Sequence, residues 1–293
     1  MKKFQGTGVA IVTPFKADMS VDYPALEKLV RHLHNGGVEF LVVQGTTGES
    51  VTLDKAERQE VLAFVKELNA NKLPIVLGHG GNDTKALIEA LDEIDFDGVD
   101  AILSVSPYYN KPTQTGIYKH YKMLSEACPV DIILYNVPGR TASNIAWQTT
   151  MSLAKDFENI IGTKEAAGDL EQVAKVINNS PEDFLVLSGD DALSVPHMAV
   201  GGDGVISVIA NAFPAVFSDM LRHCLNNRYS EARKNYYRLN KLIDLIFAEG
   251  NPGGIKAVLD LLEIGGQTLR PPLVSISNEL EAAIQKEVSQ IVA

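Results

Sequence analysis

Lys164 is the residue whose position raises the clearest chemical question. It follows Ile160 and Ile161 in the stretch "IIGTKEAAGDL", where a buried strand should be ending. A charged ammonium close to an apolar interior is costly unless it is paired, neutralised or put to use. The structural interpretation is that Lys164 reaches water or pairs with Glu165 or Asp169. The chemical interpretation is that Lys164 is a nucleophile.

A nucleophilic lysine must hold its amine uncharged for part of the time. A free lysine is almost wholly protonated at neutral pH and is then a poor nucleophile. An apolar wall disfavours the ammonium, and the free amine can then attack a carbonyl carbon. The resulting iminium withdraws electrons and can support carbon–carbon bond making or breaking. Both interpretations stay open on position alone.

Polar side chains after other apolar runs could serve the same chemistry. Tyr135 in "IILYNVP" is either a core residue with a satisfied hydroxyl or a proton carrier beside an imine. The loop "GTTGE" offers amides that can hold a carboxylate, beside the hydroxyls of Thr46 and Thr47, although such a loop is more often a simple turn. Arg140 lies in a loop where its planar fork suits a carboxylate, and a surface salt bridge is the alternative.

The remaining candidates are aromatic residues and histidines. Tyr108 and Tyr109 are adjacent and point opposite ways in an extended chain, so one of them is expected to line the site. No His, Cys, Asp and Glu set has metal-ligand spacing, because His32 and His34 face apart on a helix and His79 stands alone. No nucleotide motif occurs either. We therefore expect chemistry without a metal or another cofactor.

The elements that must position these side chains are short β-rich runs that alternate with amphipathic stretches. The runs are nearly continuous in apolar residues, as is typical of parallel strands covered by helices. Eight strands are predicted, at residues 8–14, 40–45, 74–80, 101–107, 131–138, 160–164, 184–189 and 204–209.

Helical patterns separate the predicted strands. Apolar residues recur at helical spacing in the stretch 26–33, and two residue pairs, Asp54 with Glu57 and Asp169 with Gln172, have capping-box spacing. Eight strands with helices between them predict an α/β fold, a (β/α)8 TIM barrel. A doubly wound open sheet is the main alternative, but it usually has fewer strands, and no GxGxxG follows the first one.

The last part of the chain carries only helical patterning, which is more helix than one barrel needs. We assign residues 1–212 to the barrel strands and most barrel helices. Residues 213–293 are assigned to the last barrel helix and a C-terminal helical extension. In such a barrel the active site lies in the loops at the carboxyl ends of the strands. The polar residues named above would all face that mouth.

The composition excludes several classes of function. With 293 residues, of which 45% are hydrophobic and 22% charged, the chain is an ordinary globular protein that can bury a large core. A net charge of −11 argues against a nucleic-acid-binding surface. No apolar run reaches the roughly 18 residues of a membrane span, and the N-terminal run is interpreted as a strand rather than a signal peptide. Cys128 and Cys224 have no CxxC context and indicate reduced thiols of a cytoplasmic protein.

Taken together, these motifs resemble the dihydrodipicolinate synthase (4-hydroxy-tetrahydrodipicolinate synthase) family of pyruvate-dependent class I aldolases, within the N-acetylneuraminate lyase superfamily. The resemblance covers essentially the whole chain. Its motifs are highly specific together, although each motif alone is weak evidence. It implies a cytoplasmic lyase that condenses pyruvate with aspartate 4-semialdehyde in diaminopimelate and lysine biosynthesis. It also implies a homo-oligomer, either a dimer or a tetramer built as a dimer of dimers. The motifs are "GTGVAIVTPF", "GTTGES", "PYYNKP", "LYNVPGRT", "GTKEAAGDL", "LSGDD" and "GVISV".

The resemblance further implies a catalytic set of four residues. Lys164 would form the imine with pyruvate, with no other cofactor. Tyr135 would donate and accept protons beside it. Thr46 would link Tyr135 to Tyr109, which the neighbouring subunit of a tight dimer would insert.

Substrate binding is implied for three further positions. Thr47 would hold the pyruvate carboxylate, Arg140 would bind the carboxylate of the semialdehyde, and the carbonyl of Ile206 would face the substrate. Because superfamily relatives share the lysine and the tyrosine, a sialic-acid or 2-keto-3-deoxy sugar-acid aldolase is the first alternative. A catalytically silent barrel that binds a 2-oxo acid is the second. The presence of Thr46, Tyr109 and Arg140 together favours the synthase, and the intact set argues against a silent barrel.

The resemblance also bears on regulation by lysine. In lysine-inhibited members, the effector site has histidines, or a histidine and a glutamate, after the "GTTGES" loop, and another glutamate further along. In this chain the corresponding positions hold two cations, Lys55 and Arg58, and Ala86 in place of a carboxylate. These residues should repel, or fail to hold, the ammonium groups of lysine. We therefore predict a vestigial site with weak or absent inhibition. The matching residues are Ser50, Asn82 and Tyr108, and the departures are Lys55, Arg58 and Ala86.

Overall fold

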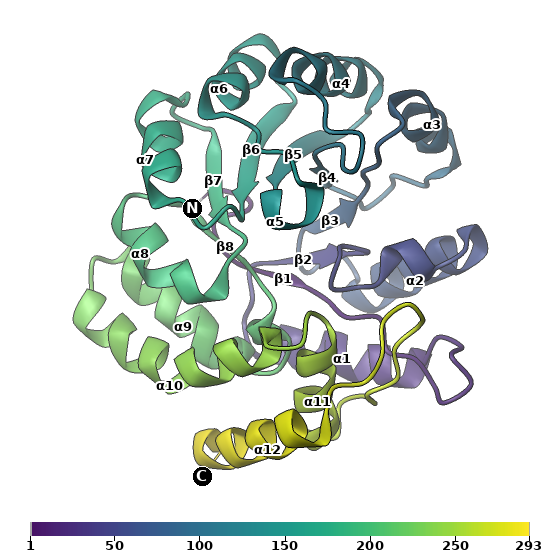
Figure 1. Ribbon diagram of the computed structural model, residues 1–293, viewed down its shortest axis with the longest axis vertical. Helices are drawn as coiled ribbons and strands as arrows, with labels where there is room; N and C mark the ends of the chain where they lie inside the picture. Colours follow the sequence, from purple (N-terminus) through teal and green to yellow (C-terminus); the bar gives the residue numbers. More distant parts are fainter. Residues whose placement is uncertain (1, 293) are drawn as a thin grey trace.

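A closed ring of eight parallel strands forms the centre of the computed structural model, which describes residues 2–292 (Figure 1). The strands follow one another around the ring in chain order, and the eighth pairs with the first to close it. The predicted TIM barrel is therefore confirmed. The strands are β1 (Gly6–Ala10), β2 (Phe40–Val43), β3 (Ile75–Gly78), β4 (Ala101–Val105), β5 (Asp131–Asn136), β6 (Ile160–Glu165), β7 (Leu185–Ser188) and β8 (Gly204–Ser207).

All eight predicted strands are present, and the largest displacement is in the first. The apolar run suggested residues 8–14, whereas β1 spans Gly6–Ala10. The reason is that the amide of Val12 donates to the side chain of Asn211, 3.2 Å away, and not to a neighbouring strand. The end of the apolar run is therefore buried loop.

Helices cover the outside of the ring and fill the connections between strands (Figure 1). Short 3-10 turns η1 (Ser50–Thr52), η2 (Ala90–Glu93), η3 (Asp191–Leu193) and η4 (Ile209–Asn211) supplement them. The helices are α1 (Tyr23–Asn35), α2 (Lys55–Asn69), α3 (Thr84–Glu89), α4 (Gln114–Ala127), α5 (Pro138–Thr141), α6 (Trp147–Asp156), α7 (Leu170–Asn179), α8 (Ser194–Ala199), α9 (Pro214–Leu225), α10 (Tyr229–Phe247), α11 (Gly253–Leu261) and α12 (Asn278–Val292).

Two of the predicted helix starts can be compared with the observed caps. Before α2, the Asp54 carboxylate accepts from the amide of Glu57 at 2.9 Å, and the Glu57 carboxylate accepts from the amide of Asp54 at 3.1 Å. This is the complete capping box. Before α7, Asp169 accepts from the amide of Gln172, but the Gln172 side chain donates to Glu165 instead of returning to the cap. The second box is therefore only half formed.

The core has two layers separated by the strands. An inner cluster fills the ring and contains Tyr135, Leu187 and Ile206. A larger outer cluster lies between the strands and the helices, and the apolar face of α1 belongs to it. Each fully buried leucine or valine in these layers stabilises the fold by about 1.5–3 kcal/mol relative to an exposed one. This packing holds the strand ends, and so the residues on them, in fixed positions.

The last four helices include the expected C-terminal extension. Helix α9 packs against β1 and α10, and α12 packs against α10 and α11. In Figure 1, α11 and α12 lie together at one side of the ring, next to α1. The boundary that we place after residue 212 stays a prediction. Among the described helices, none is both long and apolar enough to cross a membrane.

Candidate active site

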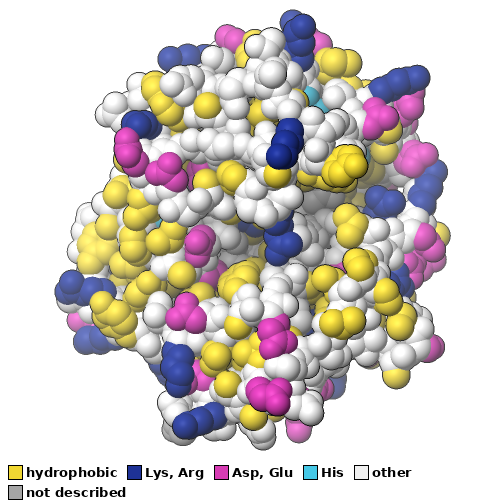
Figure 2. Space-filling model, in the orientation of Figure 1, with side chains coloured by type: hydrophobic (Ala, Val, Ile, Leu, Met, Phe, Trp, Pro, Cys, Tyr) yellow, Lys and Arg dark blue, Asp and Glu magenta, His cyan; other side chains and the backbone are white. Residues whose placement is uncertain are grey.

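A cavity of about 1290 Å³ opens at the carboxyl ends of the barrel strands. Figure 2 shows the corresponding hollow near the middle of this face, with basic side chains beside it. Five of the seven predicted catalytic and substrate-binding residues line the cavity, and they come from four different segments of the chain. They are Thr46, Thr47, Tyr135, Arg140 and Lys164.

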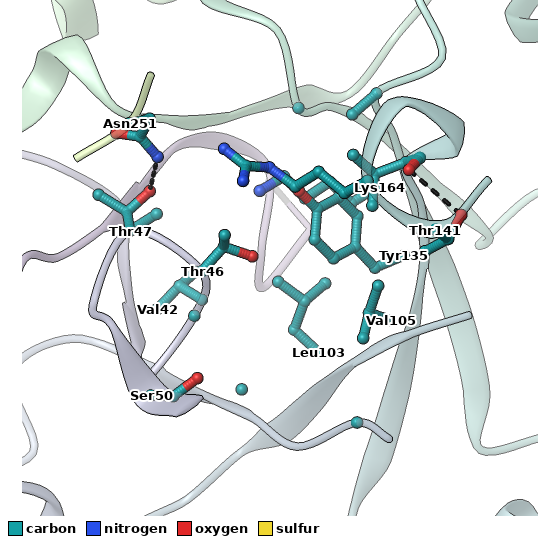
Figure 3. A pocket seen from close by; sticks show the side chains of 18 of the residues that line it. Val42, Thr46, Thr47, Ser50, Leu103, Val105, Tyr135, Thr141, Lys164 and Asn251 are labelled. Carbon is teal, nitrogen blue, oxygen red and sulfur yellow. Dashed lines mark hydrogen bonds between the residues drawn. The ribbon is translucent and has the colours of Figure 1, made fainter. Parts of the chain in front are cut away.

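Lys164 and Tyr135 lie side by side at the bottom of this cavity. They are partners in the register between β5 and β6, so both side chains project from neighbouring strands to the same side. The Lys164 Nζ lies 4.4 Å from the centroid of the Tyr135 ring. Lys164 is 6% exposed and Tyr135 is 8% exposed. Figure 3 shows Lys164 beside the Tyr135 ring, with Thr46 across the cavity from it.

The ion pair of Lys164 with Glu165 or Asp169, one half of the structural interpretation, is wrong. Successive residues of a strand face opposite sides, so Glu165 points out of the barrel and accepts from Asn136 at 3.0 Å. Asp169 is used as the cap of α7. Within residues 2–292, no carboxylate lies within 4.0 Å of the Lys164 Nζ. The amine is therefore buried without an anionic partner.

Gly189, at the end of β7, makes room for the lysine side chain. A Cβ atom at this position would lie 2.7 Å from Lys164 Cε and 2.7 Å from the Cβ of Ala166. Carbon atoms in contact are normally about 3.5–4.0 Å apart, so only glycine fits beside the lysine in its observed position. The sequence motif "LSGDD" includes this glycine, but nothing in the sequence shows what it faces.

The loop after β2 offers free backbone donors to the cavity. Its own turn uses the amides of Gly48 and Glu49, which donate to the carbonyls of Gly45 and Thr46. The amides of Thr46 and Thr47 donate to no protein acceptor within the described part of the chain. Two adjacent free amides form the kind of concave site that binds a carboxylate.

Side chains from distant segments hold this loop in place. The Thr47 hydroxyl accepts from Nδ2 of Asn251 at 2.8 Å, as the dashed line in Figure 3 marks. The hydroxyl of Thr13 donates to the carbonyl of Gly48 at 2.7 Å. Asn251 also lines the cavity. It was not predicted as a site residue, because it lies 204 residues from Thr47 and belongs to no recognisable motif.

A buried ion pair lies directly behind the loop. Glu49 is 2% exposed and Lys256, on α11, is 1% exposed, and their Oε1 and Nζ atoms are 2.5 Å apart. Desolvation lowers the pKa of Lys256, and the charge of Glu49 opposes that shift. Sequence reasoning missed this pair. The signal that could have found half of it is the lysine inside the otherwise apolar run "GGIKAVL".

Asp191 is another polar residue that sequence reasoning missed. Its Oδ2 accepts from the amides of Val208 and Ile209, at 2.9 and 2.8 Å, and so joins the end of β7 to the loop after β8. Burial raises the pKa of Asp191 to about 6, against the effect of these hydrogen bonds. The carboxyl therefore supports the rim of the barrel near Ile206.

Two predicted residues do not line the cavity of their own chain. Tyr109 is 88% exposed and Ile206 is 1% exposed within β8. The neighbouring Tyr108 does line the cavity, as the opposite directions of adjacent side chains predict. Arg140 is exposed and makes no salt bridge to a carboxylate of the described chain. Arg140 therefore lines the cavity without a carboxylate partner among residues 2–292.

The predicted effector residues form a separate wall of the same cavity. Arg58 and Ala86 both line it, so position 86 itself offers no carboxylate to an ammonium. Lys55 does not line the cavity, because its Nζ pairs with Glu93 at 2.7 Å. Of the two cations that we expected to repel the lysine ammonium groups, only Arg58 therefore lines the cavity. The matching residues on this wall are Ser50, Asn82 and Tyr108.

No group of three or more His, Cys, Asp and Glu side chains within residues 2–292 is arranged to hold a metal ion. His79, near this wall, has a pKa lowered mainly by desolvation.

A TIM barrel with a buried lysine next to a tyrosine at its mouth defines a Schiff-base-forming lyase of the class I aldolase type. The chain belongs to the dihydrodipicolinate synthetase family, whose model matches residues 3–291. It is 51% identical to the 4-hydroxy-tetrahydrodipicolinate synthase of Flavobacterium psychrophilum, over 99% of each chain.

Solved structures of relatives have the same fold. The dihydrodipicolinate synthase of Thermotoga maritima matches with a TM-score of 0.96 at 36% identity, over 99% of each chain. The chloride-inhibited dihydrodipicolinate synthase of Acinetobacter baumannii, solved in complex with pyruvate, matches with a TM-score of 0.95 at 35% identity, again over 99% of each chain.

Proposed function

We infer that this chain is a 4-hydroxy-tetrahydrodipicolinate synthase, which condenses pyruvate with L-aspartate 4-semialdehyde in diaminopimelate and lysine biosynthesis. The observation that carries this proposal is the buried Lys164 amine, 4.4 Å from the Tyr135 ring centroid and without a carboxylate partner among residues 2–292. The whole-chain match to relatives with this name supports the choice of substrates. The chemistry needs no metal or cofactor beyond the imine.

The first half of the reaction activates pyruvate. The free amides of Thr46 and Thr47 bind the pyruvate carboxylate and bring its C2 carbon to the Lys164 amine. The amine attacks C2, and Tyr135 protonates the oxygen that leaves as water. Loss of a proton from the methyl group then converts the imine to an enamine, because the iminium accepts the electron pair.

The second half forms the carbon–carbon bond. Arg140, which lines the cavity, binds the carboxylate of the semialdehyde and orients its aldehyde carbon. The enamine carbon attacks this aldehyde, and the amino group of the semialdehyde then displaces Lys164 from C2. Ring closure regenerates the lysine amine, and one water is released overall. The carbonyl of Ile206 is proposed to face the bound substrate.

The proton relay of this proposal needs a second subunit. Tyr109 is 88% exposed and has a left-handed φ of 72°, so its side chain is available to a neighbouring chain. We propose that it completes the partner's site through Thr46 and that the assembly is a dimer of such dimers. A cytoplasmic location is also proposed, supported by the two buried free thiols, Cys128 and Cys224.

The direct test of this proposal is reductive trapping. Borohydride with pyruvate should add the reduced pyruvyl group to the peptide that contains Lys164, as detected by mass spectrometry. The variant Lys164→Ala, with unchanged circular dichroism, is the control and should not be labelled. An unlabelled wild-type lysine in the folded protein would refute the function.

The alternative aldolase keeps the imine and changes the acceptor. Coupled assays that compare aspartate 4-semialdehyde with N-acetylmannosamine separate the two functions, and turnover with the semialdehyde alone is expected. A catalytically silent barrel would turn over neither acceptor.

A further inference from the structure

The loop that offers the two free amides is held in a conformation that it would not prefer on its own. Glu49 closes the loop with φ 52° and ψ 34°, the left-handed region that a residue with a side chain seldom occupies. Such a conformation persists only where the surroundings over-determine it. Its anchors are therefore relevant to where the amides of Thr46 and Thr47 lie.

The Glu49 carboxylate is the strongest of these anchors. One oxygen accepts from the Lys256 ammonium at 2.5 Å, and the other accepts from the backbone amide of Arg270 at 3.1 Å. Lys256 also donates to the carbonyl of Thr268 at 2.9 Å, and its Nζ lies 4.3 Å from the ring centroid of Phe15. The carboxylate is thus held from two sides by α11 and by the segment that follows it.

Neither charge can be explained by contact with solvent or with substrate. Both side chains are almost completely buried, and neither is among the residues that line the cavity. A buried ion pair is costly to form and gives weak net stability compared with apolar residues of similar volume. Buried pairs are instead well suited to specify one geometry, since each charge accepts only its partner.

We propose that the Glu49–Lys256 ion pair is a positioning device for substrate binding, through which the C-terminal extension sets the position of the carboxylate-binding amides. The proposal rests on the proposed function, because it assumes that those amides bind the pyruvate carboxylate. Through this pair the extension takes part in the reaction, although neither Glu49 nor Lys256 lines the cavity.

The experiment measures trapping of Lys164 by pyruvate and borohydride as a function of pyruvate concentration. In Glu49→Gln, an amide nitrogen must face either the Lys256 ammonium or the Arg270 amide, and both are donors, so one contact is lost. The half-saturating pyruvate concentration should rise about tenfold or more, the effect of one charge-assisted hydrogen bond. The limiting trapping rate should stay within about threefold, because Lys164 and Tyr135 are untouched.

The matched control is Glu39→Gln, at the opposite end of the barrel. Glu39 has the same arrangement, since one oxygen accepts from Arg222 at 2.7 Å and the other from the amide of Thr7 at 2.8 Å. This variant should lower the thermal midpoint while its half-saturating pyruvate concentration stays at the wild-type value.

The double variant Glu49→Gln with Lys256→Met separates positioning from stability. It removes both charges, so the thermal midpoint should recover relative to either single variant. The half-saturating concentration should remain raised, because the link between α11 and the loop is still missing. Recovery of wild-type pyruvate saturation in the double variant would overturn the proposal, and so would unchanged saturation in Glu49→Gln. An absence of trapping in the wild-type protein would instead overturn the proposed function.

Discussion

The space left by Gly189 permits a quantitative prediction. In Gly189→Ala, the new Cβ would lie 2.7 Å from both Lys164 Cε and the Cβ of Ala166. Since carbon contacts are about 3.5–4.0 Å, something must move by about 1 Å. Ala166 follows β6 directly and its amide donates to the carbonyl of Asn136, so it is held by backbone. The lysine stem will move instead.

A lysine amine displaced by about 1 Å should cost about 100-fold in kcat/KM, or about 2.7 kcal/mol of activation free energy. The fold should survive, because an extra methyl group in a packed site typically costs about 1–3 kcal/mol of stability. The assay is steady-state condensation with pyruvate and aspartate 4-semialdehyde, together with the rate of borohydride trapping at Lys164. Both rates should fall, since both depend on the amine.

Gly265→Ala is the matched control for this variant. Its new Cβ would have ordinary contacts, 3.7 Å to the Cβ of Pro14 and 3.8 Å to that of Ala25, and Gly265 is not among the residues that line the cavity. Activity within about threefold of wild type is expected for it. If Gly189→Ala also keeps wild-type kcat/KM, then the position of the lysine stem does not limit the reaction, and the reasoning fails.

Three further predictions concern regulation, pH and subunit contact. L-Lysine should inhibit weakly or not at all, and Arg58→His combined with Ala86→Glu should gain inhibition in a dose series. Burial lowers the pKa of His120 from 6.5 to about 4. The contribution of the neutral, buried imidazole to folding stability is therefore complete above pH 6.5 and is lost as the pH falls toward 4. At about pH 4.5, urea unfolding of the wild-type protein should give a free energy of unfolding lower by about 2–3 kcal/mol. His120→Gln should lack this loss. When Lys164→Ala and Tyr109→Phe subunits are mixed, about half of the dimers are hybrids, and each hybrid has one complete site out of two. About a quarter of all sites should therefore be active.

Each of these predictions has an outcome that contradicts it. Strong inhibition of the wild-type enzyme by sub-millimolar L-lysine would remove the argument from Arg58 and Ala86. Parallel pH dependences for wild type and His120→Gln would show that the buried imidazole is not the acid-sensitive group. No gain of activity on mixing would mean that Tyr109 acts within its own chain.

The architecture was predictable because each strand carries its own local signal. Parallel strands buried on both sides are apolar throughout, and their eight repeats with intervening helical periodicity leave few folds open. Local signals failed where a long-range contact intervened. The first strand ends early because Asn211, 199 residues away, takes the amide of Val12. The cap at Asp169 is half formed because Gln172 is drawn to buried Glu165.

The residues of the candidate site likewise divide into those that local sequence signals indicate and those that only long-range contacts reveal. Lys164 and Tyr135 stand out in the sequence because a polar group at the end of an apolar strand is expensive. Their position side by side depends on the register between β5 and β6, which one chain segment cannot specify, whereas the opposite direction of Glu165 follows from alternation within its own strand. Glu49 belongs to the "GTTGES" motif, but nothing in that motif shows its partner, and Asn251 and Lys256 belong to no motif that marks them as site residues.

The amino-acid sequence by itself therefore determined the barrel and the family and marked Lys164 as the candidate imine-forming residue, since these depend on patterns within short segments. Only the tertiary structure decided which partner each charge has. Lys164 is left without an anion among residues 2–292, Glu49 is joined to Lys256 and Gly189 is placed against the lysine stem. The physical reason is that pairing energies depend on distance and burial, and in a closed ring both are set by strands and helices far apart along the chain.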